Sequence, residues 1–323
     1  MKVGVVACTY NGEAYLAEQL STFLTQSRMP DEIVISDDAS TDGSWELIQA
    51  FASKARARKI RVTAVRQPDR LGYVGNFSRA LEMATTDIVF LCDQDDAWHP
   101  DKVATMAAAF EADPALIFLH SDARLVDASG TDIGHGLFEA LEVSEDERSG
   151  VRDGDAFTVY LRRNLATGAA SAFRRSLLDV ALPLPAAWIH DAWLAVLAAG
   201  TGRIAIIDDP LIDYRQHGGN QIGVARRTRG QRFADMFRAR NETLRKDAAR
   251  LEVLIVRFEE VGIKGPFVAT TRAMRDHLTA RVRIGGQPLW RRISGVGREW
   301  LTGRYGRFGT GARSAIRDLL RIG

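Results

Sequence analysis

Few cysteines and no long apolar run set the first limits on this chain. Cys8 and Cys92 are the two cysteines among 323 residues, and both lie within apolar stretches. We therefore expect buried free thiols in a reducing compartment, and the composition excludes a small domain held together by disulfides. No apolar stretch approaches the roughly 18 residues that a membrane-spanning helix needs. Because a strand pattern begins within the first few residues, we expect no secretory signal peptide.

Charge is divided unevenly along the chain. The formal net charge is +2, but residues 1–224 hold 20 Lys and Arg against 32 Asp and Glu, whereas residues 225–323 hold 23 against 9. A basic region that follows an acidic one indicates an anionic partner for the basic part. On charge alone, nucleic acid and acidic phospholipid both qualify.

The first half of the chain alternates strand and helix patterns. Each apolar strand-like stretch is followed by a stretch with helical periodicity. Such repeated units predict an α/β fold with a mostly parallel sheet and helices on both faces. Ligands of such sheets bind at the carboxyl ends of the strands. The expected strands are residues 2–9, 31–36, 60–65, 87–92 and 116–119, and the expected helices are 13–26, 44–57, 73–84 and 100–112.

The second half of the chain is less regular. Residues 128–156 are rich in Gly, Asp, Glu and Ser, which favours a loop insertion. Two short strands, a short helix at 190–199 and, from about Arg229, a helical pattern follow. The two short strands are expected at 203–207 and 211–216. The expected domains are an α/β domain at 1–224, with halves at 1–120 and 121–224, and a basic helical region at 225–323.

An aspartate cluster at the end of the fourth expected strand carries the most chemical information. Asp93, Asp95 and Asp96 directly follow the apolar stretch Ile88–Cys92. Carboxylates this close repel one another unless a cation lies among them. A divalent metal that also holds a diphosphate suits the cluster, because hard cations prefer carboxylate oxygen. The plain alternative is a solvated acidic turn, and the aspartates at neighbouring strand ends argue against it.

Two earlier strands also end in polar motifs. After the first strand, ACTYNG (residues 7–12) can present backbone amides to a ligand, although Asn11 can equally cap the next helix. After the second strand, Asp38 can accept hydrogen bonds from a ribose hydroxyl or a base, whereas Asp42 fits a helix cap better. Arg70, next to a glycine-containing turn, can neutralise a phosphate or remain a plain surface arginine.

Read together, these motifs resemble a known enzyme family. In this order and spacing, ACTYNG, ISDDASTDGS, RLGYVGNFSRAL and DQDD resemble the family 2 inverting glycosyltransferases with the GT-A fold, over about residues 1–224. The resemblance implies a Rossmann-like nucleotide-diphospho-sugar transferase fold, a nucleoside-diphosphate-sugar donor and bound Mg²⁺ or Mn²⁺. The implied donor-binding residues are Thr9, Asn11, Glu13, Asp38, Arg70, Asp93 and Gln94, and the implied metal ligands are Asp95, Asp93 and His217.

The resemblance also assigns chemistry on the acceptor side. Asp191, in WIHDAWL, corresponds to the general base that takes the proton of the acceptor hydroxyl, although the residue also fits a helix N-cap. Gly168, His190 and Trp193 are expected on the acceptor side, and His190 is not expected to be the base. His217, in YRQHGGN, is expected on a loop that closes over the diphosphate, with an ordinary hydrogen-bonding loop residue as the alternative.

The expected substrates and location also follow from the resemblance. The patterns CDQDDAWHPDK and IHDAWL look most like members that assemble bacterial surface polysaccharide, including rhamnosyltransferases. A dTDP-L-rhamnose donor and a glycan or lipid-linked glycan acceptor are therefore the first expectation, and UDP-hexoses remain open. Trp and Arg alternate in residues 289–301, which fits binding to anionic lipid. We expect a cytoplasmic protein, peripheral at the inner face of the membrane, and no nucleic-acid partner, since no aromatic RNA-reading motif is present.

Three other classes of protein fit less well. Phosphatases of the haloacid dehalogenase type place their DxD on the first strand with Thr or Val two residues later, whereas here it follows the fourth strand and Ala97 occupies that place. Nucleotidyltransferases carry a basic residue in the first loop, which ACTYNGEAY lacks. A catalytically inactive nucleotide-sugar-binding or nucleic-acid-binding protein with the same fold remains an alternative. The presence of Asp38, Asp95 and Asp191 together favours an active enzyme.

Overall fold

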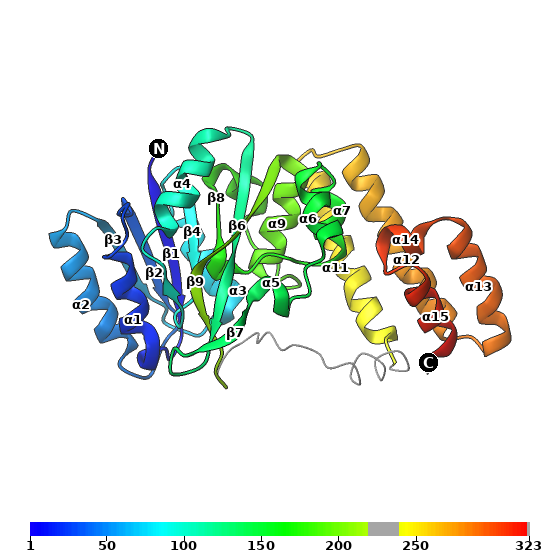
Figure 1. Cartoon of the computed structure of the whole chain (residues 1–323), viewed down its shortest axis with the longest axis horizontal. Coiled ribbons are helices and arrows are strands. Elements are labelled where there is room, and N and C mark those ends of the chain that lie inside the picture. Colours follow the sequence, from blue (N-terminus) through cyan, green and yellow to red (C-terminus); the bar gives the residue numbers. More distant parts are fainter. Residues whose placement is uncertain (219–238, 322–323) are drawn as a thin grey trace. The chain divides into compact units, whose positions relative to one another are not determined.

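The computed structural model describes residues 1–218 and 239–321, which belong to two compact units (Figure 1). The first unit is Met1–Ala225 and the second is Arg226–Gly323. The expected start of the helical pattern near Arg229 and the end of the YRQHGGN motif lie outside the described residues. Within the described part of the chain, no helix combines the length and the apolarity that crossing a membrane requires.

One mixed sheet forms the centre of the first unit. Strands β3, β2, β1 and β4 are neighbours in that order and pair in parallel, as do β6 and β9. Strand β8 is antiparallel to both β4 and β6. The short strands β5 and β7 pair antiparallel with β9 and β6. The strand order is β3 (Arg61–Arg66), β2 (Glu32–Asp37), β1 (Val3–Thr9), β4 (Ile88–Cys92), β8 (Ser171–Arg174), β6 (Leu116–Val126), β9 (Arg203–Arg215) and β5 (Ala97–Trp98), with β7 (Asp132–Gly136) beside β6.

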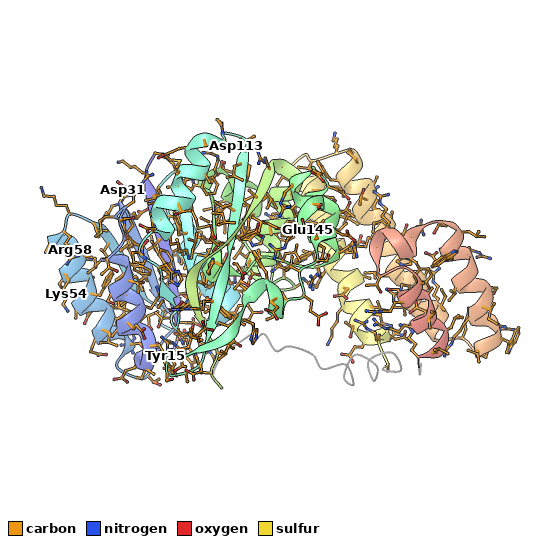
Figure 2. All side chains as sticks on the ribbon, viewed as in Figure 1. Tyr15, Asp31, Lys54, Arg58, Asp113 and Glu145 are labelled. Atoms are coloured by element: carbon orange, nitrogen blue, oxygen red, sulfur yellow. The ribbon has the colours of Figure 1, made fainter. Side chains whose placement is uncertain are left out.

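Helices cover both faces of this sheet. On one face, α1 (Glu13–Phe23), α2 (Ser44–Ala57) and α4 (Lys102–Ala112) share a buried apolar core with alternate residues of β1, β2 and β4. Elsewhere α3 (Gly72–Glu82) packs on β1 and β2, and α9 (His190–Thr201) packs on β6 and β9. Charged side chains such as Lys54 and Arg58 project from α2 and its end into solvent (Figure 2). The α/β class predicted from the repeated strand–helix pattern is confirmed.

Two regions differ from the sequence-based expectation. Residues 128–156 were expected to form a loop insertion, but they contain β7, α5 (Leu137–Ala140) and α6 (Glu145–Arg152), and α7 (Ala156–Arg162) follows. Their polar composition is typical of a loop, but two of these polar residues, Ser144 and Glu147, form a capping box that begins α6. The two short strands expected at 203–207 and 211–216 are one strand, β9, which pairs along β6 with shifts in register.

The second unit consists of helices in its described part. Its helices are α11 (Asn241–Glu260), α12 (Pro266–Gly285), α13 (Leu289–Leu301), α14 (Arg304–Phe308) and α15 (Ala312–Leu320). The buried side of α11 consists of Leu244, Leu251, Leu254, Ile255 and Phe258, and this helix packs against α12. The helical extension expected after the α/β domain is therefore present.

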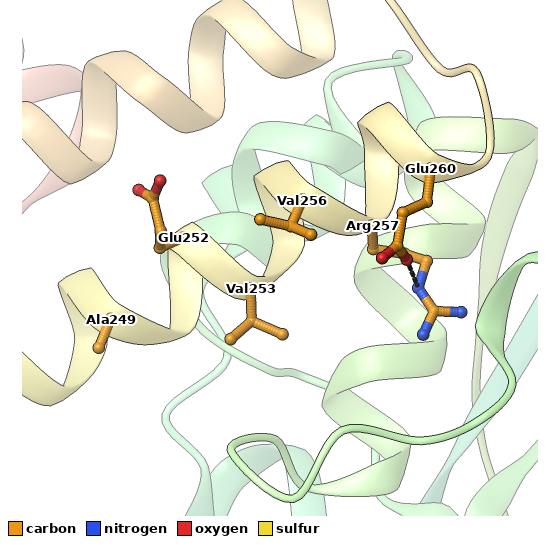
Figure 3. A pocket seen from close by; sticks show the side chains of 6 residues that line it. All are labelled: Ala249, Glu252, Val253, Val256, Arg257 and Glu260. Atoms are coloured by element: carbon orange, nitrogen blue, oxygen red, sulfur yellow. Dashed lines mark ion pairs between the residues drawn. The ribbon is translucent and has the colours of Figure 1, made fainter.

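A shallow hollow of about 540 Å³ runs along one side of α11 (Figure 3). Its lining comes from this helix alone and includes Val253, Val256 and an ion pair between Arg257 and Glu260 with an N–O distance of 3.2 Å. A hollow formed by a single helix lacks the convergent polar groups that mark a ligand site. The candidate site therefore lies in the first unit.

A buried ionic network links three helices of the second unit. Asp318 on α15 is fully buried, and its Oδ2 accepts hydrogen bonds from Arg281 Nε at 2.7 Å and Tyr305 Oη at 2.8 Å. Arg321 also lies 3.5 Å from Asp318 Oδ1. The carboxylate is thus the common partner of two buried guanidinium groups.

Replacing this carboxylate tests the network. We expect Asp318→Ala to destabilise the protein by about 3–5 kcal/mol, because removing one partner leaves buried cations uncompensated. Asp276→Ala, which removes a half-exposed carboxylate paired with Arg275, should cost no more than about 1 kcal/mol. Chemical unfolding of the full chain measures both, and equal losses for the two variants would contradict the role of Asp318.

Candidate active site

A cleft of about 730 Å³ opens at the carboxyl ends of the parallel strands. Its walls come from the segments after β1, β2 and β4, the first turns of α3 and α9, residues 164–168 and the end of β9. The strand-end residues gather here because the parallel strands β2, β1 and β4 end at the same edge of the sheet. Predicted site residues that line the cleft are Thr9, Asn11, Asp38, Arg70, Asp93, Gln94, Asp95, Gly168, His190, Asp191 and His217.

Gln94 fixes the shape of the loop after β1. Tyr10 N–H donates to Gln94 Oε1 at 2.7 Å, and Gln94 Nε2 donates back to the carbonyl of Tyr10 at 3.2 Å. Gly12 leaves room for this amide, since a Cβ at that position would lie 2.6 Å from Gln94 Oε1. Asn11 adopts φ 48°, and its Oδ1 accepts from Thr41 N–H at 2.8 Å. The first loop is therefore held by the loops after β4 and β2.

Asp38 holds the start of α3 in this structure. Its two carboxylate oxygens accept the N–H groups of Leu71 at 2.6 Å and Gly72 at 2.9 Å, and the residue is 2% exposed. Arg70 precedes these two residues in the sequence, and its guanidinium lies 4.0 Å from the ring centroid of Tyr10. Asp38 thus orders a cationic, aromatic edge of the cleft, and donor binding by Asp38 and Arg70 stays a prediction. Asp42 was expected to cap α2, but the N-cap is Gly43; Asp42 lies just before it and accepts Ser44 N–H at 3.0 Å.

The aspartate cluster is only partly accessible. Burial raises the pKa of Asp93 to about 7, and the negative charges of Asp95 and Asp191 add to that effect. Asp96 is 1% exposed; its Oδ1 accepts Arg215 N–H at 3.0 Å, and burial raises its pKa well above the ordinary value. Asp93 and Asp95 therefore face the cleft, whereas Asp96 anchors the end of β9 beneath them.

A buried lysine that the sequence did not single out lies beside this cluster. Lys102 is fully buried, its ammonium lies 3.9 Å from the ring centroid of Trp98, and it donates to the carbonyl of Ala169. Burial lowers the pKa of Lys102 to about 7, while Cys92, Asp96 and Asp93 act in the opposite direction. A lysine nine residues after Asp93, in DDAWHPDK, was the available signal, but nothing local marks it as buried.

Asp95 and His217 supply a candidate half-site for a metal ion. His217 Nε2 lies 2.8 Å from Asp95 Oδ2, and the imidazole packs against Tyr15 with ring centroids 4.7 Å apart. Among residues 1–218 and 239–321, no group of three or more His, Cys, Asp or Glu side chains is arranged to hold a metal. Mg²⁺ is commonly held by one or two carboxylates together with substrate phosphates, so these residues fit a metal that arrives with a diphosphate.

Asp191 sits at the first turn of α9 with a fully organised carboxylate. Oδ1 accepts from Asn164 Nδ2 at 3.1 Å and from Ala192 N–H at 2.5 Å, and Oδ2 accepts from Gly168 N–H at 3.0 Å. Burial raises the pKa of Asp191 to about 6, although the hydrogen bonds from Ala192, Gly168 and Asn164 pull it down. A fixed carboxylate with such a pKa is suited to accept a proton near neutral pH.

His190 forms an uncharged wall next to Asp191. Its ring stacks on Phe77 with centroids 4.0 Å apart, and a Cβ at Gly168 would lie 2.7 Å from its Nε2. The side chain is 6% exposed, and neither ring nitrogen has a hydrogen-bond partner among the described residues. Burial lowers the pKa of His190 to about 3, so the ring is neutral at physiological pH. The expectation that His190 is not the base stays a prediction.

Two predicted site residues, Trp193 and Glu13, do not line the cleft. Trp193 is fully buried and donates its indole N–H to the carbonyl of Ala181, so its side chain belongs to the core. Glu13 does not line the cleft; its carboxylate accepts Gly43 N–H and steadies the start of α2. Arg215, next to His217 in the sequence, donates to the carbonyl of Asp95 and to Glu18, so its guanidinium is held by the protein.

Curated relatives match most of the length of the chain. The sequence is 28% identical over 225 residues to an uncharacterized glycosyltransferase of Nostoc sp., covering 68% of this chain and 66% of that protein. It is 24% identical over 258 residues to the dTDP-rhamnosyl transferase RfbG of Shigella flexneri, covering 75% of this chain and 82% of RfbG. In the Nostoc protein and in mycobacterial relatives, where the match covers 59%, the chain spans less than two thirds of the relative's length.

Solved structures share the fold. S. aureus TarS 1–349 in complex with UDP-GlcNAc has a TM-score of 0.57 at 18% identity, covering 98% of this chain and 90% of TarS 1–349. The mannosyltransferase PcManGT of Pyrobaculum calidifontis, in complex with GDP-Man and Mn²⁺, has a TM-score of 0.52 at 20% identity, covering 98% and 85%. These likenesses confirm the GT-A fold that the motifs predicted.

The family itself is shown by a match to its sequence model. The model described as Glycosyl transferase family 2 matches residues 4–180, which include the segments after β1, β2 and β4 that build the cleft. Because this match spans more than half of the chain, the protein belongs to glycosyl transferase family 2.

Proposed function

We propose that this protein is a metal-dependent, inverting glycosyltransferase that moves a sugar from a nucleoside diphosphate to a glycan. The observation that carries the proposal is that one cleft holds both a candidate metal half-site, Asp95 with His217, and a buried, fixed carboxylate, Asp191. Transfer with inversion needs these two parts: charge stabilisation at the leaving diphosphate and a base for the acceptor.

Asp191 is the base in this proposal. As the acceptor oxygen bonds to the anomeric carbon, its proton passes to a carboxylate oxygen of Asp191. The bond from the anomeric carbon to the diphosphate oxygen breaks, and its electron pair leaves with the nucleoside diphosphate. The hydrogen bonds from Gly168 and Asn164 hold the carboxylate in one orientation, so little reorganisation accompanies the proton transfer.

Asp93, Asp95 and His217 act on the leaving group. Asp95 and His217 would hold Mg²⁺ or Mn²⁺, and the metal would neutralise charge on the departing diphosphate. Asp93, whose pKa is raised to about 7 by burial, becomes a better carboxylate ligand once a cation is close by. The side chains of Asp95 and His217 are 13% and 15% exposed, which limits the water that can compete with the acceptor.

The donor that we propose first is dTDP-L-rhamnose. Its support is the similarity to a dTDP-rhamnosyl transferase over 75% of this chain, together with the CDQDDAWHPDK and IHDAWL motifs. UDP-sugars and GDP-sugars are the competing donors, since TarS and PcManGT were solved with UDP-GlcNAc and GDP-Man. The process that we propose is bacterial cell-surface polysaccharide assembly.

Two substitutions separate donor binding from turnover. Asp95→Ala should abolish Mn²⁺-dependent binding of the donor in calorimetry, because it removes the carboxylate that meets His217. Asp191→Asn should keep donor binding within about threefold and lower turnover by at least about 10³-fold, since the amide cannot take the acceptor proton. A donor screen over dTDP-, UDP- and GDP-sugars with wild-type protein precedes both. Binding without turnover in wild type would instead favour the inactive nucleotide-sugar-binding protein.

The pH profile reports on Asp191 directly. The base works only when ionised, and burial raises its pKa to about 6. We therefore expect kcat/KM for the acceptor to fall about tenfold per pH unit below pH 6 and to be level above it. Donor affinity measured at each pH separates this effect from protonation of Asp93. An acid limb near pH 4, where an ordinary aspartate titrates, would contradict the raised pKa of the base.

A lipid-linked acceptor at the inner face of the membrane completes the proposal. On α13, the side chains of Leu289, Trp290, Ile293 and Leu301 are 60%, 67%, 64% and 88% exposed, and helical geometry places them on one side. Arg291, whose guanidinium lies 4.6 Å from the Trp290 ring centroid, is exposed beside them. Aromatic residues at headgroup depth with adjoining arginines suit an anionic lipid surface.

Vesicle binding tests this attachment. The 323-residue chain should co-sediment with vesicles containing phosphatidylglycerol and not with pure phosphatidylcholine. Trp290→Ala combined with Leu301→Ala should weaken binding at least about tenfold, because it removes much of the exposed apolar face. Val256→Ala on α11, also an exposed apolar residue, serves as the matched control and should bind normally. Undiminished binding of the double variant would refute the role of α13.

A further inference from the structure

Three side chains that line the cleft carry buried polar atoms without hydrogen-bond partners. These atoms are Thr9 Oγ1, Asn76 Oδ1 and both ring nitrogens of His190. The three residues are 2%, 2% and 6% exposed. Buried polar groups are normally paired, and leaving one unpaired costs stability. Unpaired groups that line one cleft therefore indicate a ligand that completes their hydrogen bonds.

The ring of His190 is held in one orientation although its nitrogens are unpaired. It stacks on Phe77 of α3 with a centroid distance of 4.0 Å and an interplanar angle of 17°. His190 is also the first residue of α9 and directly precedes Asp191. Packing therefore sets the direction of the ring nitrogens before any ligand binds.

Gly168 lies against one of these nitrogens. A Cβ at position 168 would lie 2.7 Å from His190 Nε2, so any other residue there would press on the ring. The N–H of the same glycine donates to Asp191 Oδ2 at 3.0 Å. The ring nitrogen and the carboxylate of Asp191 are thus neighbours of one glycine. A substrate group that binds Nε2 would lie close to the group from which Asp191 takes a proton.

Asn76 indicates the kind of group that the ligand supplies. Its Nδ2 donates to the carbonyl of Ser36 at 2.9 Å, and a carbonyl oxygen can only accept. This bond sets the orientation of the amide, so the unpaired atom is the acceptor Oδ1. Because burial lowers the pKa of His190 to about 3, its ring is neutral, with one nitrogen that donates and one that accepts. Uncharged groups that need both donors and acceptors suit hydroxyl groups better than phosphate.

We propose that His190 determines acceptor specificity: its Nε2 hydrogen-bonds a hydroxyl of the acceptor sugar that neighbours the attacking hydroxyl. The acceptor is accordingly a sugar with at least one free hydroxyl besides the one that attacks. The inference rests on the proposed function for the assignment of this sugar as the acceptor. The alternative is ordered water on the ring nitrogens, which would not distinguish one acceptor from another.

Removing the hydroxyl and the ring nitrogens, separately and together, tests the contact. The probes are the methyl glycosides of D-glucose, D-galactose, D-mannose and L-rhamnose, then monodeoxy analogues of the accepted glycoside that keep the attacking hydroxyl. His190→Phe keeps an aromatic ring on Phe77 and removes both nitrogens. For one hydroxyl, each change alone should lower kcat/KM for the acceptor at least about tenfold. Both together should lower it no more than about twofold further, because they remove the same bond.

Additive losses at every hydroxyl overturn the proposal, because they are expected of a ring that only packs or binds water. His135→Phe is the matched control: His135 lies in β7, outside the lining of the cleft, and its substitution should leave kcat/KM for every probe unchanged. If His190→Phe does not fold, His190→Leu replaces it in the cycle. Failure of both to fold assigns His190 to packing and overturns the proposal.

Nuclear magnetic resonance of the ring nitrogens gives a readout that needs no turnover. The chain contains six histidines, and the folded His190 variant identifies the signal of His190 by its loss. In the 323-residue chain with nitrogen-15-labelled histidine, at least one of the methyl glycosides should shift this signal in a saturable way, and inorganic phosphate at the same concentration should not. A signal that no glycoside moves overturns the proposal. A shift caused by the nucleotide sugar alone also overturns it, because the hydroxyl would then belong to the donor.

The two experiments keep this inference separate from the proposed function. If wild type turns over no nucleotide sugar, the function fails, while the glycoside titration still decides whether His190 binds a sugar hydroxyl. If wild type transfers sugar but the losses are additive and the signal does not move, the function stands and the inference fails. If wild type releases nucleotide but accepts none of the glycosides, the titration decides alone.

Discussion

Like charges that meet at the carboxyl end of β4 are the constraint on which the first unit depends. Asp93, Asp95 and Asp96 lie within four positions of the sequence. Burial removes the water that would otherwise weaken the repulsion between their carboxylates. Two partners come from a distant part of the chain, the backbone of Arg215 for Asp96 and the imidazole of His217 for Asp95, and the positive charge of Lys102, six residues after Asp96, acts on the cluster as well. Satisfying these carboxylates therefore brings the ends of β4 and β9 and the start of α4 together.

Local sequence patterns predicted those helices and strands whose ends are set by nearby residues. The helix at 44–57 begins and ends where its periodicity does, and the strand at 88–92 is a single apolar run between polar residues. The length of β6 and the continuity of β9 depend on pairing between segments about ninety residues apart, with register shifts near Pro210, and no local signal carries that information. The sheet was expected to be mostly parallel, but β8 runs against its neighbours because it returns to the sheet after α5, α6 and α7 rather than after a simple crossover.

The expectation that ligands bind at the carboxyl ends of parallel strands was sufficient to place most of the candidate site. Asp38, Asp95 and Asp191 line one cleft although they are far apart in the sequence. Trp193 was misplaced for a geometric reason: two positions along a helix turn the side chain by about 200°, so the neighbour of a cleft residue points into the core. The burial of Lys102 was equally hidden, because a lysine is buried only where tertiary contacts compensate its charge.

The close fit between Gly12 and Gln94 has a consequence for how this site can change over time. The amide of Gln94 bonds both polar groups of Tyr10, and it occupies the space where any side chain at position 12 would begin. A larger residue at 12 is compatible only with a shorter one at 94, and a shorter one at 94 leaves the first loop unbraced. We therefore expect lineages that remodel this end of the cleft to exchange both residues together or neither.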